Sequence, residues 1–321
     1  MKINIAAFRK ERRIPDVTLE TVESFLDQPD RFVIVTVRDP GPDQMKHLQA
    51  CFNLHDLAVE DASSAHQRPK LESYGATLFM ALHTAKQTVD KIVYGELHLF
   101  ISERFVILIQ HGGFIRYDTV VDRIEANPSL FSNGSGSVVY AVLDYLVDQF
   151  MFIAIHLQEQ LDLLESQIFA NKIDSTEIES LYALKRRVAK LHNAVAPVGD
   201  ICSELLRLHP ELVPTDLHPY FRDVQDHVQR TTRNTMMLRE ALSDALQVNL
   251  ALITIRQNEV VKRLAGWGAI LAVPTMFFSM YGTNFKYMPV YDWKLGYPVA
   301  MLLTAFICRE VYRKLKSSGW L

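Results

Sequence analysis

Residues 264–281 read LAGWGAILAVPTMFFSMY, and the chain continues with GTNFKYMP over residues 282–289. The first run carries no charged residue, and at about 1.5 Å per helical residue its length nearly matches the roughly 30 Å hydrocarbon core of a bilayer. A second apolar run, Tyr297–Cys308, follows, and aromatic residues near its ends, among them Trp293 and Tyr312, favour the headgroup region. The two runs predict a membrane hairpin that carries a soluble domain.

The basic residues on either side of this hairpin indicate its orientation. Between the two runs the loop offers Lys286 and Lys294 against Asp292. The positive-inside rule therefore predicts that both termini lie in the cytoplasm and that the chain is a multi-pass protein of the cell (inner) membrane. The basic residues that lead to this prediction are Lys262, Arg263, Arg309, Arg313, Lys314 and Lys316.

Composition excludes several classes of protein. A net charge of −3 and the absence of a basic tract argue against a nucleic-acid partner. The three cysteines, Cys51, Cys202 and Cys308, are far apart, so we expect neither a disulfide framework nor a Cys-x-x-Cys metal site. The chain has no phosphate-binding glycine loop, nucleophile elbow or His-Glu-x-x-His motif. We therefore expect a protein that is not an enzyme and needs no organic cofactor.

Secondary-structure signals change along the chain. Short β-rich runs at 31–37, 97–101 and 105–109 predict strands, the last two joined as a hairpin, and a helical pattern at 43–54 lies between them. These signals indicate an α+β cytoplasmic domain with a central sheet. We place its end at residue 137.

Long helical patterns follow this domain. The predicted regions are 1–137 for the cytoplasmic domain, 138–219 for antiparallel long helices, 220–281 for a stalk helix and the first transmembrane helix, 282–296 for an external loop, and 297–321 for the second transmembrane helix with a basic tail. Apolar and small residues recur along the stalk with steps of three and four, and we expect them to pack against the two preceding long helices. They are Val224, Val228, Thr231, Thr235, Leu238, Leu242 and Ala245.

Further along the same helix, this spacing picks out a second series in which every member is small or polar. One interpretation is a close helix–helix contact of small residues. The other is a water-lined path formed by several copies around an axis, because one hairpin has too few helices to enclose a pore. We call the series the polar stripe; it consists of Thr254, Asn258, Val261, Ala265, Gly268, Ala272, Thr275 and Ser279.

Four segments together suggest a family. Residues 54–61 read LHDLAVED, residues 67–70 read QRPK, residues 219–227 read PYFRDVQDH, and the chain closes with a basic stretch that ends in Trp320-Leu321. In these segments and over essentially its whole length the chain resembles the CorA family of divalent-cation channels. The resemblance implies a funnel-shaped homopentamer in the lipid bilayer, with a long pore helix from each copy and an outer second span.

The resemblance also assigns roles to individual residues. The family's Gly-Met-Asn signature matches Gly282, Thr283 and Asn284, and Asn284 would orient hydrated Mg²⁺ at the outer pore mouth. Asn258 and Thr275 match further pore-lining positions. Neutral oxygens at such positions suit a hydrated hard cation. Regulatory Mg²⁺ in the family lies between neighbouring cytoplasmic domains, and its acidic ligands match Glu60, Asp61 and Asp223.

The chain departs from the family pattern at four positions. Thr283 replaces the usual methionine, Lys286 and Val290 replace acidic character in the loop, and Gln247 stands where an acid is expected near the cytoplasmic end of the pore. Each change lowers the local attraction for cations or alters a gate contact. Ion preference and regulation therefore stay open.

Three functions remain in competition. The first is a Mg²⁺ channel, also passing Co²⁺ or Ni²⁺, that intracellular Mg²⁺ gates. The second is a Zn²⁺ transporter of the same family, coupled to protons, and the third is a non-conducting membrane sensor of Mg²⁺. The polar stripe contains no histidine, and we expect His83, His98 and His111 to be surface or packing residues, which favours Mg²⁺.

Overall fold

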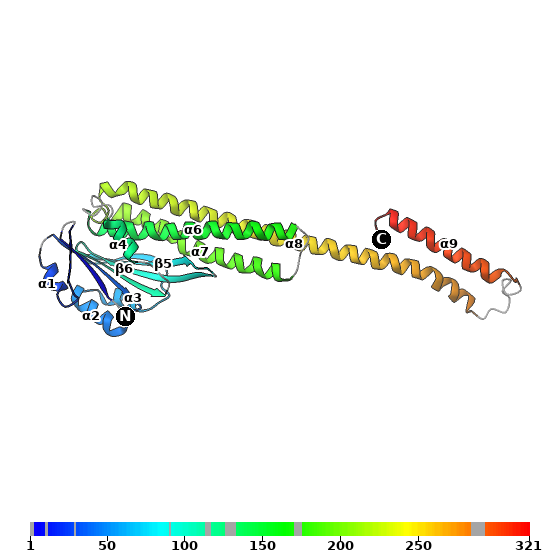
Figure 1. Cartoon of the computed structure of the whole chain (residues 1–321), viewed down its shortest axis with the longest axis horizontal. Helices are drawn as coiled ribbons and strands as arrows, with labels where there is room; N and C mark the ends of the chain where they lie inside the picture. The colour runs from blue at the N-terminus through cyan, green and yellow to red at the C-terminus, as the bar shows by residue number, and fades with distance from the viewer. Residues whose placement is uncertain are drawn as a thin grey trace. The chain divides into compact units, whose positions relative to one another are not determined.

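Figure 1 shows the computed structural model of the chain, which describes residues 3–9, 12–28, 30–89, 91–112, 117–125, 133–169, 175–283 and 293–321. The chain forms two compact units, Met1–Ser243 and Asp244–Leu321. Helix α8 (His218–Tyr281) contributes to both units.

A seven-stranded sheet forms the centre of the first unit, in the order β2-β1-β3-β7-β6-β5-β4. The pair β3 and β7 is parallel, and the other described pairs are antiparallel. The three predicted strands are confirmed, and β6 and β7 form the expected hairpin. The strands are β1 (Asn4–Arg9), β2 (Arg12–Ile14), β3 (Arg31–Arg38), β4 (Lys70–Tyr74), β5 (Thr77–Gln87), β6 (Ile92–Ile101) and β7 (Phe105–Gly112).

Helices cover both faces of this sheet. Because side chains alternate along a strand, Phe79, Phe100 and Ile107 point to one face and join the core formed with the short helices, whereas Leu82 and Leu97 are buried on the other. The result is an α/β domain in the broad sense of a sheet covered by helices, with largely antiparallel strands as in the predicted α+β class, and Figure 1 places the long helices over the second face. The first face carries α1 (Val22–Leu26), α2 (Pro42–Phe52) and α3 (Asp56–Ser63); the second carries α4 (Tyr117–Glu125), α6 (Ser135–Phe169) and α7 (Ser175–Leu208).

The N-terminal half of α8 packs on α6 and α7. His192 Nδ1 of α7 lies 2.9 Å from Thr235 Oγ1 of α8, and Gln225 Nε2 donates to Ser203 Oγ at 2.6 Å. All seven predicted seam residues are buried, which confirms the three- and four-residue spacing as a packing pattern. A short 3₁₀ turn (Thr215–Leu217) joins α7 to α8.

Two helices are long and apolar enough to cross a membrane by length and composition, α6 and the helix that ends at Tyr281. Most of the apolar stretch of α6 is buried inside the first unit, as in the core helix of a soluble domain. The apolar stretch of the helix that ends at Tyr281 is almost fully exposed. Helix α9 (Gly296–Ser317) is not in this pair, since any 18-residue stretch of it holds at least three charged residues. The second span therefore stays a prediction.

The seam supplies the first testable prediction. Leu238 is 1% exposed, and we expect Leu238→Ala to lower the free energy of unfolding by about 2–5 kcal/mol because it leaves a cavity between α8 and its neighbours. The neighbouring Met237 is 62% exposed, so Met237→Ala is the matched control, with an expected change within about 0.5 kcal/mol. Denaturant unfolding of the purified protein in detergent measures both, and equal losses would contradict the packing described.

Candidate cation path and cytoplasmic acidic cluster

Every residue of the polar stripe is exposed in the single chain. A Cβ atom added at Gly268 would meet no atom within 4 Å. The seven seam residues in the first half of α8, by contrast, are all buried. One helix therefore has a buried face in its first half and an uncovered polar face in its second half.

Helix α9 packs against a different face of α8. On α8 the covered residues are Gly266, Ile270, Val273, Pro274, Phe277 and Tyr281, and on α9 the most buried are Gly296 and Thr304. Cys308 Sγ lies 3.7 Å from the Ile270 carbonyl oxygen. At 3.6 residues per turn this face lies roughly 160° around the helix from the polar stripe. Close packing of small residues thus occurs within the hairpin, but not on the stripe.

The two threonines of the stripe keep an acceptor available. Thr254 Oγ1 donates to the Leu250 carbonyl at 2.9 Å, and Thr275 Oγ1 donates to the Leu271 carbonyl at 2.8 Å. Such i−4 bonds use the hydroxyl hydrogen and leave a lone pair on each oxygen. The stripe therefore presents neutral oxygen acceptors on an exposed face.

The signature loop is described only up to Thr283. Gly282 N donates to the Phe278 carbonyl at 3.0 Å, and Thr283 Oγ1 donates to the Met280 carbonyl at 2.7 Å. A Cβ at Gly282 would meet nothing closer than 3.5 Å, so nothing within this described part of one chain requires glycine there. Asn284, Lys286 and Val290 lie outside the described residues.

Asn249 is a buried polar residue on α8 that the sequence analysis did not single out. Asn249 is 1% exposed, and within the described structure neither its amide nitrogen nor its amide oxygen has a hydrogen-bond partner. A buried amide without a partner is costly, which marks this position as unusual. It lies four residues after Ala245, so extending the seam spacing by one step would have found it. Gln247, between the two, is exposed.

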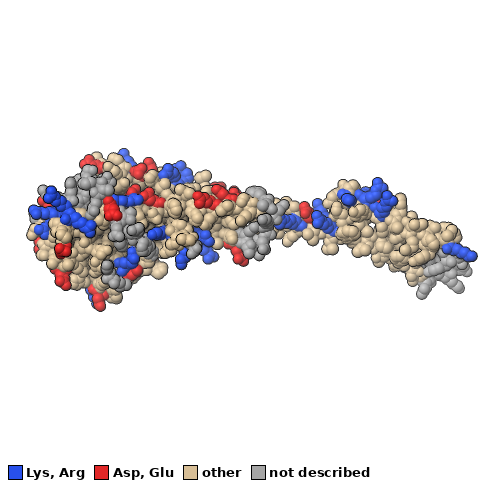
Figure 2. Space-filling model, viewed as in Figure 1, with Lys and Arg blue, Asp and Glu red and all other residues tan. Residues whose placement is uncertain are grey.

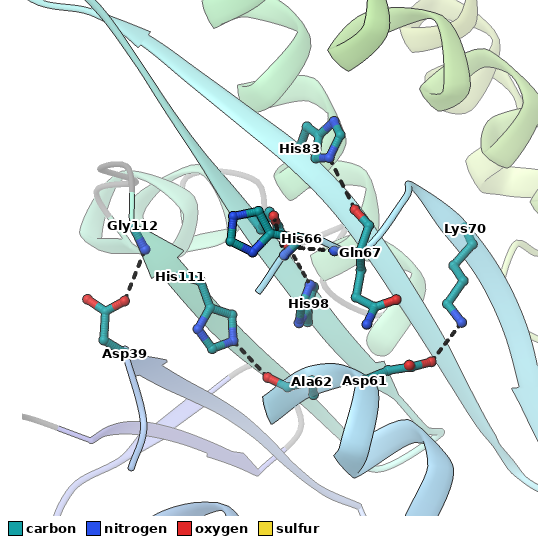
Figure 3. A network of polar contacts seen from close by, with 11 residues as sticks. Asp39, Asp61, Ala62, His66, Gln67, Lys70, His83, His98, His111 and Gly112 are labelled. Carbon is teal, nitrogen blue, oxygen red and sulfur yellow. Dashed lines mark hydrogen bonds and ion pairs between the residues drawn. The ribbon is translucent and has the colours of Figure 1, made fainter. Parts of the chain in front are cut away.

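The first two acids matched by resemblance lie on α3, under the first face of the sheet. Glu60 is exposed, and Asp61 Oδ2 accepts from Lys70 Nζ at 2.7 Å, as Figure 3 shows. The same ammonium contacts Glu72 Oε2 at 2.7 Å. Burial disfavours the charge of Lys70, but the bonds to Asp61 and Glu72 outweigh it and raise the pKa of Lys70 above its ordinary value.

The third acid, Asp223, does not form a cluster with Glu60 and Asp61 within one chain. It lies in the second turn of α8 with its side chain 60% exposed, 3.9 Å from His227 Nε2. Within the described residues no group of three or more His, Cys, Asp or Glu is placed to hold a metal ion. Because α3 covers one face of the sheet and α8 packs on helices of the other, a cation held by Asp61 and Asp223 would have to lie between two copies.

A polar network joins β6 and β7 to the end of α3 and the loop that follows it, and it was not predicted from the sequence. Glu96 accepts from the backbone nitrogens of His66 at 2.7 Å and Gln67 at 3.1 Å, and so fixes the loop between α3 and β4. His111 Nε2 donates to the Ala62 carbonyl at 2.7 Å (Figure 3). His98 is fully buried beside them, 3.4 Å from Glu96 Oε2. His98 and His111 thus serve in packing, as expected.

Comparison with known proteins identifies the family. A sequence profile for the CorA-like Mg²⁺ transporter protein matches residues 29–316. The chain belongs to the CorA-like Mg²⁺ transporter family. The cobalt/magnesium transport protein CorA of Thermotoga maritima is 28% identical over 324 residues, which cover 100% of this chain and 91% of that protein. Members of this family are membrane proteins that transport divalent cations, and the chain is one of them.

Solved structures share the fold. The complete structure of the CorA magnesium transporter from Methanocaldococcus jannaschii superposes with a TM-score of 0.82 at 18% identity, covering 100% of both chains. A full-length CmaX protein gives a TM-score of 0.76 at 22% identity, covering 98% of both chains. At these identities the likeness shows the fold: a soluble α/β domain followed by a long helix.

The buried His98 predicts a pH effect on stability. Burial lowers the pKa of His98, and the neighbouring His111 lowers it further against the opposing Glu96 carboxylate. An unfolded histidine binds a proton near pH 6.5 and the folded one does not, so stability falls as the pH drops through about 6.5. We expect His98→Leu to flatten this part of the pH profile of unfolding, measured in detergent. An unchanged slope in the variant would contradict this assignment.

Proposed function

We propose that several copies of this chain surround an axis and that their polar stripes line a path for hydrated Mg²⁺. The observation that carries this proposal is that the whole stripe is exposed while α9 covers the opposite face of α8. An uncovered polar stripe facing lipid is unfavourable, because hydrocarbon cannot hydrogen-bond its amide and hydroxyl groups. Neighbouring copies and water can do so.

The proposed assembly is a homopentamer with both termini in the cytoplasm and the 282–296 loop outside. The family membership supports a multimeric pore, and the basic residues at the cytoplasmic ends of both helices support the orientation. Figure 2 shows Lys and Arg side chains gathered near one end of the α8–α9 hairpin and a smaller basic patch at its other end, with a largely uncharged surface between them. Asn284 is proposed to orient the hydrated ion at the outer mouth.

The chemistry of the stripe favours Mg²⁺ over Zn²⁺. Its polar members are Thr254, Asn258, Thr275 and Ser279, all neutral oxygen donors, with no histidine, cysteine or carboxylate. Mg²⁺ releases its water reluctantly and interacts with such groups through its hydration shell, whereas Zn²⁺ prefers nitrogen and sulfur ligands. Conduction requires weak binding, which neutral oxygens provide.

We further propose that intracellular Mg²⁺ closes the channel by bridging Asp61 of one copy and Asp223 of the next. Carboxylate oxygens are suitable ligands for Mg²⁺, and Asp61 and Asp223 lie on different sides of the domain. In each chain Lys70 already neutralises Asp61. A cation that takes Asp61 Oδ2 as a ligand therefore competes with the Lys70 ammonium, which can remain paired with Glu72.

Ion uptake into proteoliposomes tests the proposed transport. We expect Mg²⁺ entry that does not depend on a pH gradient and that Asn284→Ala abolishes without disturbing assembly, with empty liposomes as the control. Zn²⁺ entry that rises with the gradient would instead establish the proton-coupled transporter. Absence of flux for every ion in correctly assembled protein would contradict transport and favour the non-conducting sensor.

The competition at Asp61 gives a separate prediction. Without the ammonium, Lys70→Met should lower the Mg²⁺ concentration that half-closes the channel by roughly two- to fivefold, since a partly exposed ion pair contributes about 0.5–1 kcal/mol. Lys91→Met removes the same charge from an exposed position and is the matched control. The measurement is Mg²⁺-dependent protection of the cytoplasmic domain from proteolysis. A higher Mg²⁺ requirement in Lys70→Met would contradict the proposed competition.

A further inference from the structure

The end of α9 contains a specific chain reversal. Gly319 has a φ of +71°, its backbone nitrogen donates to the Lys316 carbonyl at 3.2 Å, and the Trp320 nitrogen donates to the Leu315 carbonyl at 2.9 Å. These two bonds form a Schellman motif, which ends a helix sharply and usually brings an apolar residue back onto a neighbouring surface. Here the reversal directs residues 320–321 toward α8.

Leu321 lies against the backbone of Gly266. A Cβ atom built at Gly266 would be 3.2 Å from Leu321 Cγ and 3.3 Å from Leu321 Cδ2, and 3.6 Å from the Trp320 carbonyl oxygen. Most real Cβ contacts are longer, so an alanine at this position would require the Leu321 side chain to shift by a few tenths of an ångström. Among residues 250–283, all of which the structure describes, Gly266 is the single buried position.

The contact lies beside the polar stripe. Gly266 follows Ala265 directly and begins the face of α8 that α9 covers, whereas residues 257–265 are exposed throughout. Moving along α8 from Leu250, Gly266 is therefore the first residue that the rest of this unit encloses.

Both helices carry mostly basic residues near this contact. Lys262 and Arg263 on α8 and Arg309, Arg313, Lys314 and Lys316 on α9 are all positive, and Glu310 is already bonded to Arg313 at 3.0 Å. Like charges on adjacent helices repel. Burial of the Leu321 side chain on Gly266 opposes that repulsion and holds the two helix ends together.

We propose that Leu321 is a positioning residue for transport: seated on Gly266, it fixes the polar stripe of α8 against α9. The positioning role rests on the proposed cation path, whereas the contact itself does not. The hydrophobic end of the basic tail thereby links the part of the chain that meets the membrane surface to the helix that lines the path.

Two readouts on the full-length, assembled protein test this role. The first is quenching of Trp320 fluorescence by acrylamide, in a background with Trp267→Phe and Trp293→Phe so that Trp320 is the remaining tryptophan. The second is Mg²⁺ flux into proteoliposomes. The variants are Gly266→Ala, Leu321→Ala and their combination, with Leu302→Ala as the matched control because Leu302 is 72% exposed on α9.

We expect each single variant to increase quenching of Trp320 and to lower Mg²⁺ flux by about fivefold, the factor that corresponds to about 1 kcal/mol. The combined variant should be no worse than the more severe single one, because Leu321→Ala removes the two atoms that the new Cβ would meet. Leu302→Ala should leave both readouts at the wild-type value.

Two results would overturn the role. Unchanged quenching in Gly266→Ala would show that the contact does not form, and increased quenching with unchanged flux would show that it only orders the tail. Absence of flux in the wild-type protein, with the quenching pattern as expected, would contradict the proposed function while confirming the contact.

Discussion

Burial of one face of α8 against α6 and α7 is the interaction on which the rest of the structure depends. A helix that extends from His218 to Tyr281 cannot be stable in water through its own hydrogen bonds and needs a packed partner. The seam provides that partner for the first half and ends near Ala245. Beyond Ala245, among the described residues, α9 is the main element that packs on α8. It does not pack on the polar stripe, which stays exposed. The same helix is thus a core element in one unit and carries an uncovered polar face in the other.

Local spacing explains what could be predicted. The seam and the polar stripe both follow from three- and four-residue steps, and the β6–β7 hairpin follows from two apolar runs around a short turn. Strands β1, β2, β4 and β5 were not predicted, although β1 pairs with β2 and β4 pairs with β5 across short turns. Pairing between strands that are distant in sequence has no local signal at all. The parallel pair β3 and β7 is an example, since about seventy residues separate its strands. The short helix α3 lies largely within the stretch LHDLAVED that suggested the family, but its helical structure was not predicted.

In the candidate site, too, some features follow from local spacing and others depend on contacts between distant parts of the chain. Exposure of the stripe agrees with its sequence pattern, but the separation between Asp223 and Asp61 needed the three-dimensional arrangement of helices around the sheet. Glu96 bonds backbone groups about thirty residues earlier in the chain, and Leu321 meets a glycine more than fifty residues earlier. No local pattern signals such contacts. Residues 284–292, which include the signature asparagine, are assigned by resemblance alone.

The proposed cation path requires that the polar stripe, and not the neighbouring face of α8, meets water inside the assembly. Thiol accessibility tests it most directly, in protein whose three native cysteines are replaced by serine. Ala272→Cys and Leu271→Cys lie at the same depth on different faces, and both positions are exposed in the single chain. If the stripe lines a water-filled path, a charged, membrane-impermeant thiol reagent modifies Ala272→Cys and blocks Mg²⁺ flux, and Leu271→Cys is left unmodified. Modification of Leu271→Cys with Ala272→Cys protected would contradict it.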